Sequence, residues 1–517
     1  MRDLILSIDC GTQSLRAIIF DCRGSFLAVA RKDYEPYFSR YPGWAEQDPE
    51  LLWSSLVECC LELSQKNQEL LERVAGVAVT AQRSTYILLD ESGDPLRPAV
   101  TWMDQRKAKN KARIGTGRRL ALSAVGMYEP VRVVERECKL NWIRQNEPQL
   151  WEKTHKVLQV SGFLNYRLTG KFKDSVASQI GYIPFNYRKG RWAGKRDIKS
   201  LIFPLEEEKR YTLVEPGDVL GYITSEASRV TGMEQGLPVF AAGSDKGCET
   251  IGSGVNSPEQ ACLSLGTTAT VQTTTDFYCE PIRFLPAYPA SLPGKFNPEV
   301  QVFRGFWMLR WFRQEFAARE VEEAHRRGIA PEELLNRLLR EVPPGSMGLV
   351  LQPMWGPDPK NPEAKGAMIG FSDVHTRAHI YRAIIEGLGF SLLDGLFRIE
   401  NATGTPVKRL AAAGGASRSD DICRIIASIF NMPVNRGRVE EASALGAAVV
   451  ASVGAGLHRS FGEATETMVG HGEEFLPVPG ESEIYRKLYR RVYRKMFTTL
   501  RPLYRKIREI TGYPRKI

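Results

Sequence analysis

Asp9-Cys10-Gly11-Thr12-Gln13-Ser14 and Leu265-Gly266-Thr267-Thr268 are two Gly-Thr turns that lie far apart in one chain. Each turn follows an apolar run typical of a β-strand, Leu4 to Ile8 in the first case and Ala261 to Leu265 in the second. Glycine permits a tight turn whose free backbone N–H groups can bind an anion, and the neighbouring hydroxyls add donors. Either turn alone could be an ordinary hairpin. Together they suggest that the phosphates of one nucleotide bind between two lobes, each of which contributes one turn.

The length and composition predict a two-lobed globular protein. A chain of 517 residues is too long for one core, and 43% hydrophobic with 25% charged residues is typical of soluble domains. The most membrane-like segment, Ala442 to Leu457, is shorter than a span requires and is interpreted as a buried helix. No secretory leader opens the chain, and the nine cysteines form no C-x-x-C pair, so we expect a cytoplasmic protein with free thiols.

The net charge of +10 comes from the C-terminal tail, where residues 486–516 carry twelve Lys and Arg against one acid, Glu509. A basic tail can bind nucleic acid or an anionic membrane surface. However, Leu488, Val492, Met496 and Leu500 recur at helical spacing. The favoured interpretation is a helix that packs one face on the body and leaves a basic face in solvent, with neither nucleic acid nor membrane as a partner.

Strand and helix patterns alternate in both halves, which predicts α/β lobes. Residues 3–31 read as three strands joined by tight turns, and Asp48 with Pro49 predicts the start of a helix. The boundary between the lobes is expected near 250–260. The predicted division is therefore 1–254 for the first lobe, 255–465 for the second, and 466–517 for a basic helical extension.

Two further signals concern chemistry. Asp245 follows an apolar strand and precedes a Gly-rich segment, so it is either a general base or the N-cap of a helix. Gly414-Gly415-Ala416 follows the strand from Arg409 to Ala413 and precedes a helix near Asp420, which suggests a nucleotide site or a plain strand-to-helix turn. The sequence contains no Walker loop.

In this order the motifs resemble the FGGY carbohydrate kinases over almost the whole chain, to about residue 460. The segments that carry the resemblance are Asp9-x-Gly11-Thr12-x-Ser14-x-Arg16, Pro42-Gly43-Trp44-x-Glu46-x-Asp48-Pro49, Gln82-Arg83, Trp102-x-Asp104-x-Arg106, Lys139-Leu140-x-Trp142-Ile143, Gly243-x-Asp245, Gly366-x-Met368-x-Gly370, Gly414-Gly415-Ala416-Ser417 and Ala444-Leu445-Gly446-Ala447-Ala448. The resemblance implies two actin-like or hexokinase-like (ribonuclease H-like) lobes with an interlobe cleft. It implies transfer of the γ-phosphoryl group of Mg-ATP to a hydroxyl of a sugar or polyol. The alternative is a non-catalytic relative that binds sugar or nucleotide.

The resemblance also implies roles for residues. Asp245 is expected to be the general base, and Asp9 is expected to orient Mg²⁺, because this hard cation favours oxygen ligands. The residues expected to bind ATP are Gly11, Thr12, Gln13, Ser14, Arg16, Gly266, Thr267, Gly414, Gly415, Ala416 and Asp420.

The acceptor side is expected to comprise Gln82, Arg83, Ser84, Trp102, Asp104 and Lys246. Ser84 stands where the similar glycerol kinases have Glu, and Arg83-Ser84 stands where xylulokinases have Met-His. Lys246 could bind an acidic or highly oxygenated substrate, or it could pair with Glu249. The expected acceptor is therefore a sugar or sugar alcohol of unassigned identity, and a homodimer is compatible with this assignment.

Overall fold

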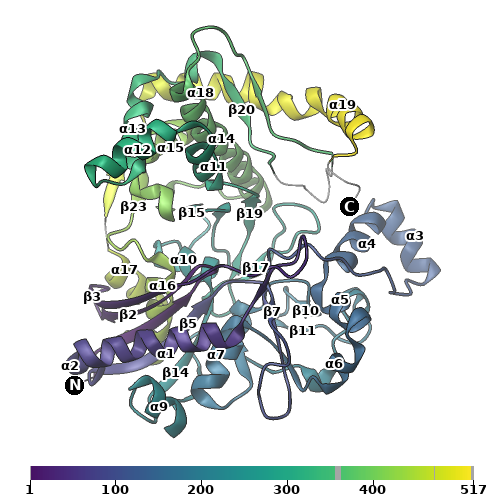
Figure 1. Cartoon of the computed structure of the whole chain (residues 1–517), viewed down its shortest axis with the longest axis vertical. Helices are drawn as coiled ribbons and strands as arrows, with labels where there is room; N and C mark the ends of the chain where they lie inside the picture. The colour runs from purple at the N-terminus through teal and green to yellow at the C-terminus, as the bar shows by residue number, and fades with distance from the viewer. Residues whose placement is uncertain (1, 356–362, 471, 514–517) are drawn as a thin grey trace.

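The computed structural model describes residues 2–355, 363–470 and 472–513, and these form two lobes that each surround a six-stranded sheet (Figure 1). The first sheet has the order β13-β14-β5-β1-β2-β3. Its strands are β1 (Leu4–Cys10), β2 (Ser14–Asp21), β3 (Phe26–Asp33), β5 (Val74–Ala81), β13 (Val219–Tyr222) and β14 (Pro238–Ser244). The three predicted N-terminal strands are thus confirmed.

The second sheet has the order β19-β16-β15-β22-β23-β24. Its strands are β15 (Gln260–Leu265), β16 (Ala269–Gln272), β19 (Glu299–Val302), β22 (Arg409–Ala413), β23 (Val434–Arg436) and β24 (Glu473–Phe475). The centre of this sheet repeats that of the first, because β15 pairs antiparallel with β16 and parallel with β22, as β1 does with β2 and β5. The predicted two-lobed α/β fold is confirmed.

Helices cover both sheets. In the first part of the chain these are α1 (Pro49–Lys66), α2 (Gln68–Leu71), α3 (Thr116–Ala124), α4 (Tyr128–Glu137), α5 (Lys139–Asn146), α6 (Pro148–Lys153), α7 (Val160–Thr169), α8 (Ile198–Ile202), α9 (Ser225–Thr231) and α10 (Asp245–Gly252). After the second turn they are α11 (Trp307–Phe316), α12 (Ala318–Arg327), α13 (Pro331–Glu341), α14 (Arg377–Thr403), α15 (Asp420–Phe430), α16 (Ala442–Gly454), α17 (Phe461–Val469), α18 (Pro479–Leu488) and α19 (Arg494–Thr511).

Short strands complete the lobes. A four-stranded sheet in the first lobe has the order β4-β7-β6-β8. The short strands are β4 (Glu46–Gln47), β6 (Tyr86–Leu89), β7 (Ala99–Val100), β8 (Lys156–Gln159), β9 (Lys173–Ser175), β10 (Phe185–Asn186), β11 (Arg191–Trp192), β12 (Thr212–Val214), β17 (Tyr288–Pro289), β18 (Phe296–Asn297), β20 (Val350–Gln352) and β21 (Ala367–Ile369).

The local signals in the sequence explain how helix α1 begins on the first sheet. The Asp48 side chain caps the helix by accepting a hydrogen bond from the amide of Glu50, and Pro49 occupies the first helical position, as predicted. The buried face of α1, which includes Leu52, Leu56 and Leu63, packs in one core with β1 and β5. This packing fixes the strand that leads into the first Gly-Thr turn.

Helix α16 comes late in the chain but lies on the first sheet (Figure 1). It is buried, as predicted for this segment, and packs with Ile5, Phe20 and Phe240 of the first lobe. Ser7 on β1 donates a hydrogen bond from Oγ to the carbonyl of Ala444, 2.7 Å away. The part of the chain between residues 255 and 465 therefore contributes to both lobes.

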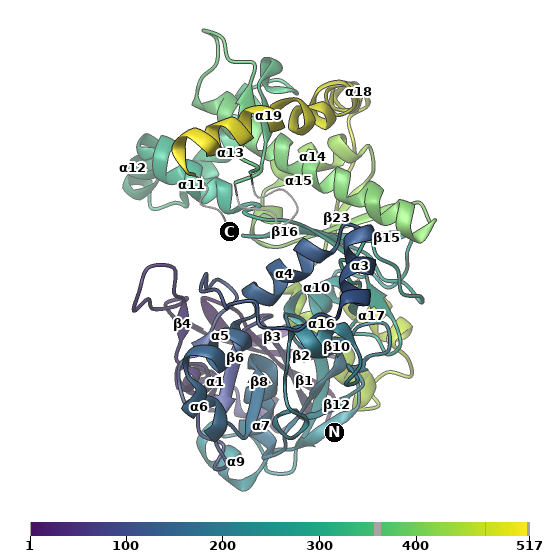
Figure 2. The same cartoon turned by 90° about the vertical axis from the view of Figure 1, so that its right-hand side faces the viewer.

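The predicted extension, residues 466–517, is helical from Pro479 to Thr511, but it also contains β24 of the second sheet. Helices α18 and α19, joined by a π-helical segment (Tyr489–Tyr493), cross the second lobe at the end of the molecule remote from α1 (Figure 2). Tyr485, Met496 and Tyr504 are buried, and most of the basic side chains are exposed. Within the described ranges, none of the helices combines the length and hydrophobicity that a membrane span requires.

Candidate functional site

The first Gly-Thr turn joins β1 to β2, and the second joins β15 to β16, so the two turns occupy corresponding places in the two lobes. The amide of Gly11 donates to the carbonyl of Ser14, which closes the first turn. In the second turn, the carbonyls of Gly266 and Thr267 accept from the amides of Phe306 and Trp307. The start of α11 therefore holds the second turn in place.

A cavity of about 340 Å³ lies between the lobes. Asp9 and Arg16 line it from the first lobe, and Gly414 and Gly415 line it from the loop after β22. Four of the predicted ATP and metal residues thus meet in one cavity. Its further charged lining comprises three arginines and three carboxylates, namely Arg31, Arg418, Arg436, Glu249, Glu440 and Glu441, so guanidinium donors for phosphate oxygens lie among acidic groups.

Asp420 and Ala416 are near this cavity in sequence but are absent from its described lining. Asp420 instead accepts from Arg436 Nη2 at 2.9 Å in the first turn of α15. Ser419 is the N-cap of that helix, with its side chain accepting from the amide of Ile422. Asp420 can therefore contact a nucleotide directly only if its ion pair with Arg436 breaks. While the pair is intact, Asp420 can affect the nucleotide only by orienting Arg436.

Asp9 is buried at the end of β1, beside the guanidinium of Arg16. Burial raises the pKa of the Asp9 carboxyl to about 7, although Arg16 lowers it, and the nearby carboxylates of Asp245 and Glu441 raise it further. Among the described residues, no cluster of three or more His, Cys, Asp or Glu side chains could hold a metal. A single carboxylate fits Mg²⁺ that keeps waters and phosphate oxygens as its other ligands.

Asp245 is the first residue of α10, and the N-cap of this helix is Ser244, whose Oγ accepts from the amide of Gly247 at 3.2 Å. The alternative that Asp245 is the N-cap is therefore wrong. Its carboxylate accepts from the amide of Lys246 at 2.8 Å and lies 3.7 Å from Nε of Arg83. Burial raises the pKa of Asp245, and the two cations oppose this shift.

Arg83 reaches from the first lobe to Glu299 on β19, the edge strand of the second sheet. Its Nη1 and Nη2 donate to the two carboxylate oxygens of Glu299 at 3.0 and 3.2 Å, and its guanidinium lies 5.5 Å from the centre of the Tyr288 ring. Sequence reasoning missed Glu299 and Tyr288, because they are more than 200 positions from Arg83 and no motif marks them.

Lys246 also crosses to the second lobe. Its Nζ lies 2.7 Å from Glu249 Oε2 and 2.5 Å from Oγ of Ser264, which stands on β15 just before the second Gly-Thr turn. Of the two roles that the sequence left open, pairing with Glu249 is the one present here. A Cβ built on Gly266 would stand 4.0 Å from this ammonium.

A hydrogen-bonded network of Gln82, Thr12 and Trp102 links the predicted acceptor side to the first Gly-Thr turn. The indole Nε1 of Trp102 donates to Thr12 Oγ1 at 3.1 Å, and this hydroxyl donates to Gln82 Oε1 at 3.3 Å. Gln82 Nε2 in turn donates to Gln47 at 2.9 Å. The Trp102 side chain is otherwise half-exposed.

Asp104 is engaged in a buried ion pair. Its carboxylate accepts from the amide of Ala45 and from Arg106, and the Arg106 guanidinium lies 3.8 and 4.7 Å from the ring centres of Trp44 and Trp142. The side chains of Asp104 and Arg106 are 0% and 1% exposed. This arrangement supports a structural role for Asp104 in holding the loop before α1.

Ser84 adopts the left-handed region, with φ of 57°. Its amide donates to Gln159 Oε1 and its Oγ donates to the carbonyl of Ile180. A Cβ on Gly181 would stand 2.9 Å from Ser84 Oγ, so the absence of a side chain at position 181 leaves room for this hydroxyl.

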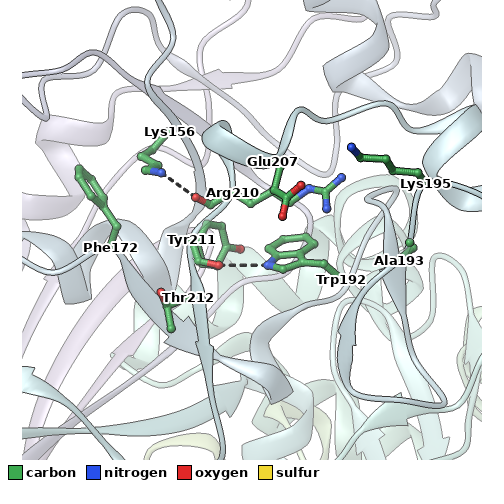
Figure 3. A pocket seen from close by; sticks show the side chains of 10 residues that line it. Lys156, Phe172, Trp192, Ala193, Lys195, Glu207, Arg210, Tyr211 and Thr212 are labelled. Atoms are coloured by element: carbon green, nitrogen blue, oxygen red, sulfur yellow. Dashed lines mark hydrogen bonds between the residues drawn. The ribbon is translucent and has the colours of Figure 1, made fainter.

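A second cavity, of about 570 Å³, lies elsewhere on the first lobe (Figure 3). Among the described residues that line it, none is a predicted site residue. Lys156 Nζ donates to the carbonyls of Glu208 and Arg210, and Trp192 Nε1 donates to the carbonyl of Tyr211. These polar groups therefore secure the local chain.

Comparisons with known proteins agree with this geometry. The FGGY family of carbohydrate kinases matches with its N-terminal domain over residues 4–252 and with its C-terminal domain over residues 261–455. The sugar kinase YgcE of Escherichia coli (strain K12) is 28% identical over 94% of this chain and 91% of its own length. A xylulose kinase of Lactococcus lactis is 27% identical over 94% of each chain.

A solved structure shows the same architecture. The xylulose kinase from Rhodospirillum rubrum superposes with a TM-score of 0.82 at 26% identity, covering 97% of this chain and 100% of that one.

Proposed function

Since this chain belongs to the FGGY family of carbohydrate kinases and is an ATP-dependent phosphotransferase with an alcohol group as acceptor, we propose that it binds the nucleotide in the interlobe cavity and phosphorylates a sugar or sugar alcohol beside it, with Asp245 as the base. The observation that carries this proposal is the cavity lined by Asp9 from one lobe and by Gly414 and Gly415 from the other. One nucleotide bound there contacts both lobes.

The chemistry requires positioning and charge neutralisation more than covalent help. Asp245 accepts the proton of the attacking hydroxyl as its oxygen bonds to the γ-phosphorus and ADP leaves. The amide of Lys246 and the Arg83 guanidinium orient the Asp245 carboxylate before the reaction. The Lys246 ammonium supports charge neutralisation on the nucleotide side, because it lies beside the strand that leads into the second turn.

Asp9 would hold Mg²⁺, which neutralises phosphate charge when bound. We assign the phosphate contacts to Gly11, Thr12, Gln13, Ser14, Arg16, Gly266 and Thr267, and the nucleoside contacts to the loop from Gly414 to Ala416 with Asp420. Residues 1–254 would supply the acceptor site and base, residues 255–465 the nucleotide site, and residues 466–517 the basic extension.

The cellular setting is also a proposal. The nine cysteines, all within the described ranges, carry free thiols, which supports a reducing cytoplasm. The buried face of the C-terminal helices supports a packing role for the basic tail and no nucleic acid or membrane partner. A homodimer is compatible with this arrangement.

A coupled assay of ADP release over pentuloses, hexuloses, pentitols and glycerol tests the function. We expect ADP release that depends on one of these acceptors, on ATP and on Mg²⁺. If saturating ATP yields no acceptor-dependent ADP with any member of the panel, while calorimetry shows that sugar or nucleotide still binds, the enzyme is instead a binding relative.

A further inference from the structure

The guanidinium of Arg83 is held on three sides. Glu299 takes both Nη atoms, Asp245 faces Nε, and the Tyr288 ring lies against the guanidinium. The side chains of Arg83 and Glu299 are 15% and 5% exposed, so the pair is largely desolvated. Burial lowers the pKa of Arg83, but Glu299 and Asp245 more than offset this, so Arg83 remains charged.

Glu299 lies at the edge of the second sheet, and this edge contacts both Arg83 and Lys246, the two cations beside Asp245. On the adjacent strand, Gln272 lies opposite Glu299 and donates from Nε2 to the carbonyl of Lys246 at 3.0 Å. The edge of the second sheet thus holds Arg83 through Glu299 and Lys246 through Gln272. Both contacts lie beside the carboxylate that is to receive the proton.

Carboxylates outnumber cations around the base even without a substrate. The cations are Arg83 and Lys246, and the carboxylates beside them are Asp245, Glu249 and Glu299. A sugar acid would bring a further negative charge into a site where carboxylates already outnumber cations. An uncharged polyol brings only hydroxyl groups. These can form hydrogen bonds with the remaining donors and acceptors of the site without adding a charge.

We propose that Glu299 determines substrate specificity. Because it occupies both Nη donors of Arg83, it excludes sugar acids and selects uncharged sugars or polyols. This inference rests on the proposed function, because it concerns the acceptor of that reaction. A planar guanidinium is the preferred partner of a carboxylate, and the bidentate pair with Glu299 uses the geometry that an aldonate would need.

An aldonate could enter only in two ways, and both are unfavourable. If Glu299 stays, the two carboxylates compete for one guanidinium and repel each other. If Glu299 moves away, it leaves a buried charge without its partner, which is strongly unfavourable. Sites with matched polar groups discriminate strongly against ligands that leave those groups unpaired.

The test compares alditols with the aldonates that differ from them only in a terminal carboxylate, such as D-glucitol with D-gluconate and xylitol with D-xylonate. The parent should favour the alditol in kcat/KM. Glu299→Gln removes the carboxylate that pairs with the Arg83 guanidinium, and it should raise the ratio of kcat/KM for the aldonate to kcat/KM for the alditol at least tenfold. Glu299→Ala should change the ratio in the same direction. The test can therefore still be made if one of the two variants fails to fold.

Two further variants serve as controls. Glu299→Asp keeps the charge and should keep the parent's preference for the alditol. Arg83→Met combined with Glu299→Gln should lose the aldonate affinity that the single variant gains, because the guanidinium is then absent. Calorimetric titration with D-gluconate gives a readout that needs no catalysis, and it should show at least tenfold tighter binding to Glu299→Gln than to the parent.

The outcomes separate this inference from the proposed function. A parent that prefers aldonates, or Glu299→Gln and Glu299→Ala variants that bind D-gluconate no more tightly than the parent, would overturn the role of Glu299. If neither parent nor variant phosphorylates any acceptor but the gain in D-gluconate binding appears, the proposed function fails and the role of Glu299 stands.

Discussion

Gly414 lies directly against Gly266, so that a Cβ built on Gly414 would stand 3.0 Å from the amide nitrogen of Gly266. The loop after β22 therefore contacts the turn between β15 and β16 through backbone alone. Gly414 has φ of 86° and ψ of 167°, a region that is essentially restricted to glycine. The loop after β22 and the turn between β15 and β16 are thus in close backbone contact.

Gly414→Ala should lower the free energy of unfolding by about 1–3 kcal/mol, because alanine is strained in this region of φ and ψ and meets the second turn. It should also raise the KM for ATP. Gly415→Ala is the matched control, because a Cβ there meets no atom within 4 Å of the described structure. Equal losses in the two variants, measured by urea denaturation, would contradict this account.

Asp245→Asn should fold and bind ATP normally but lower kcat by about 10²–10⁴-fold, because a positioned base contributes on that order. The amide cannot take up the proton of the acceptor hydroxyl. Steady-state kinetics with parallel titration of a nucleotide analogue checks both halves of the expectation. Turnover within a few-fold of the parent would show that another group is the base.

The same variant should gain stability at neutral pH. The pKa of Asp245 is raised in the folded protein, mainly by burial, above the value of 3.8 expected on unfolding. The protonated carboxyl therefore contributes stability that is fully present below pH 3.8 and is lost as pH rises through the folded pKa. Asparagine does not ionise, so the Tm of Asp245→Asn should exceed that of the parent at pH 8.

Tm measured from pH 3.5 to 8 without ligand checks this prediction, and the difference should vanish toward the acid end. A difference that is constant across the range would mean that the Asp245 carboxyl is not the group responsible.

Lys246→Gln should raise the KM for ATP roughly tenfold and leave the ranking of sugars unchanged. The reason is that its ammonium lies beside Ser264, just before the second turn, where a cation can neutralise phosphate charge. Lys246→Arg retains the charge and should lose less. If instead the sugar ranking changes while the KM for ATP stays constant, Lys246 belongs to the acceptor pocket.

Asp104→Asn should destabilise the protein by about 1–3 kcal/mol, because it removes one of the two buried carboxylates that pair with Arg106 and leaves only Glu46. Chemical denaturation measures the loss. Asp33→Asn removes one partner of an exposed ion pair with Arg31 and should have little effect. A normal unfolding curve for Asp104→Asn together with a raised sugar KM would place Asp104 in the acceptor site.

Local chemistry made much of the fold predictable. The strand from Arg409 to Ala413 and the helix start at Asp48-Pro49 agree with the structure. Both are predictable because an apolar strand and a capped helix start depend on a few adjacent residues. The two-lobed architecture followed from repeated strand and helix patterns and from the resemblance in motif order. The alternative that Asp245 is the N-cap of α10 was wrong by one residue, because Ser244 and Asp245 are both good caps.

The contacts within the site were less accessible to sequence reasoning. Glu299 binds Arg83 across 216 positions of chain, and a lone Glu in a strand carries no signal of its partner. The surroundings of Asp104 were likewise hidden, because burial of its pair with Arg106 depends on two tryptophans from separate segments. Tertiary packing, which propensity and spacing do not encode, determines these partners.

The position of α16 has a consequence for synthesis. The first sheet exposes Ile5, Phe20 and Phe240 until this helix covers them, and it cannot do so before residue 454 has left the ribosome. Most of the chain is therefore translated while an apolar face near its N-terminus remains open, a condition that favours aggregation. Nascent chains arrested before residue 440 should recruit chaperones, and those released after residue 470 should become resistant to protease.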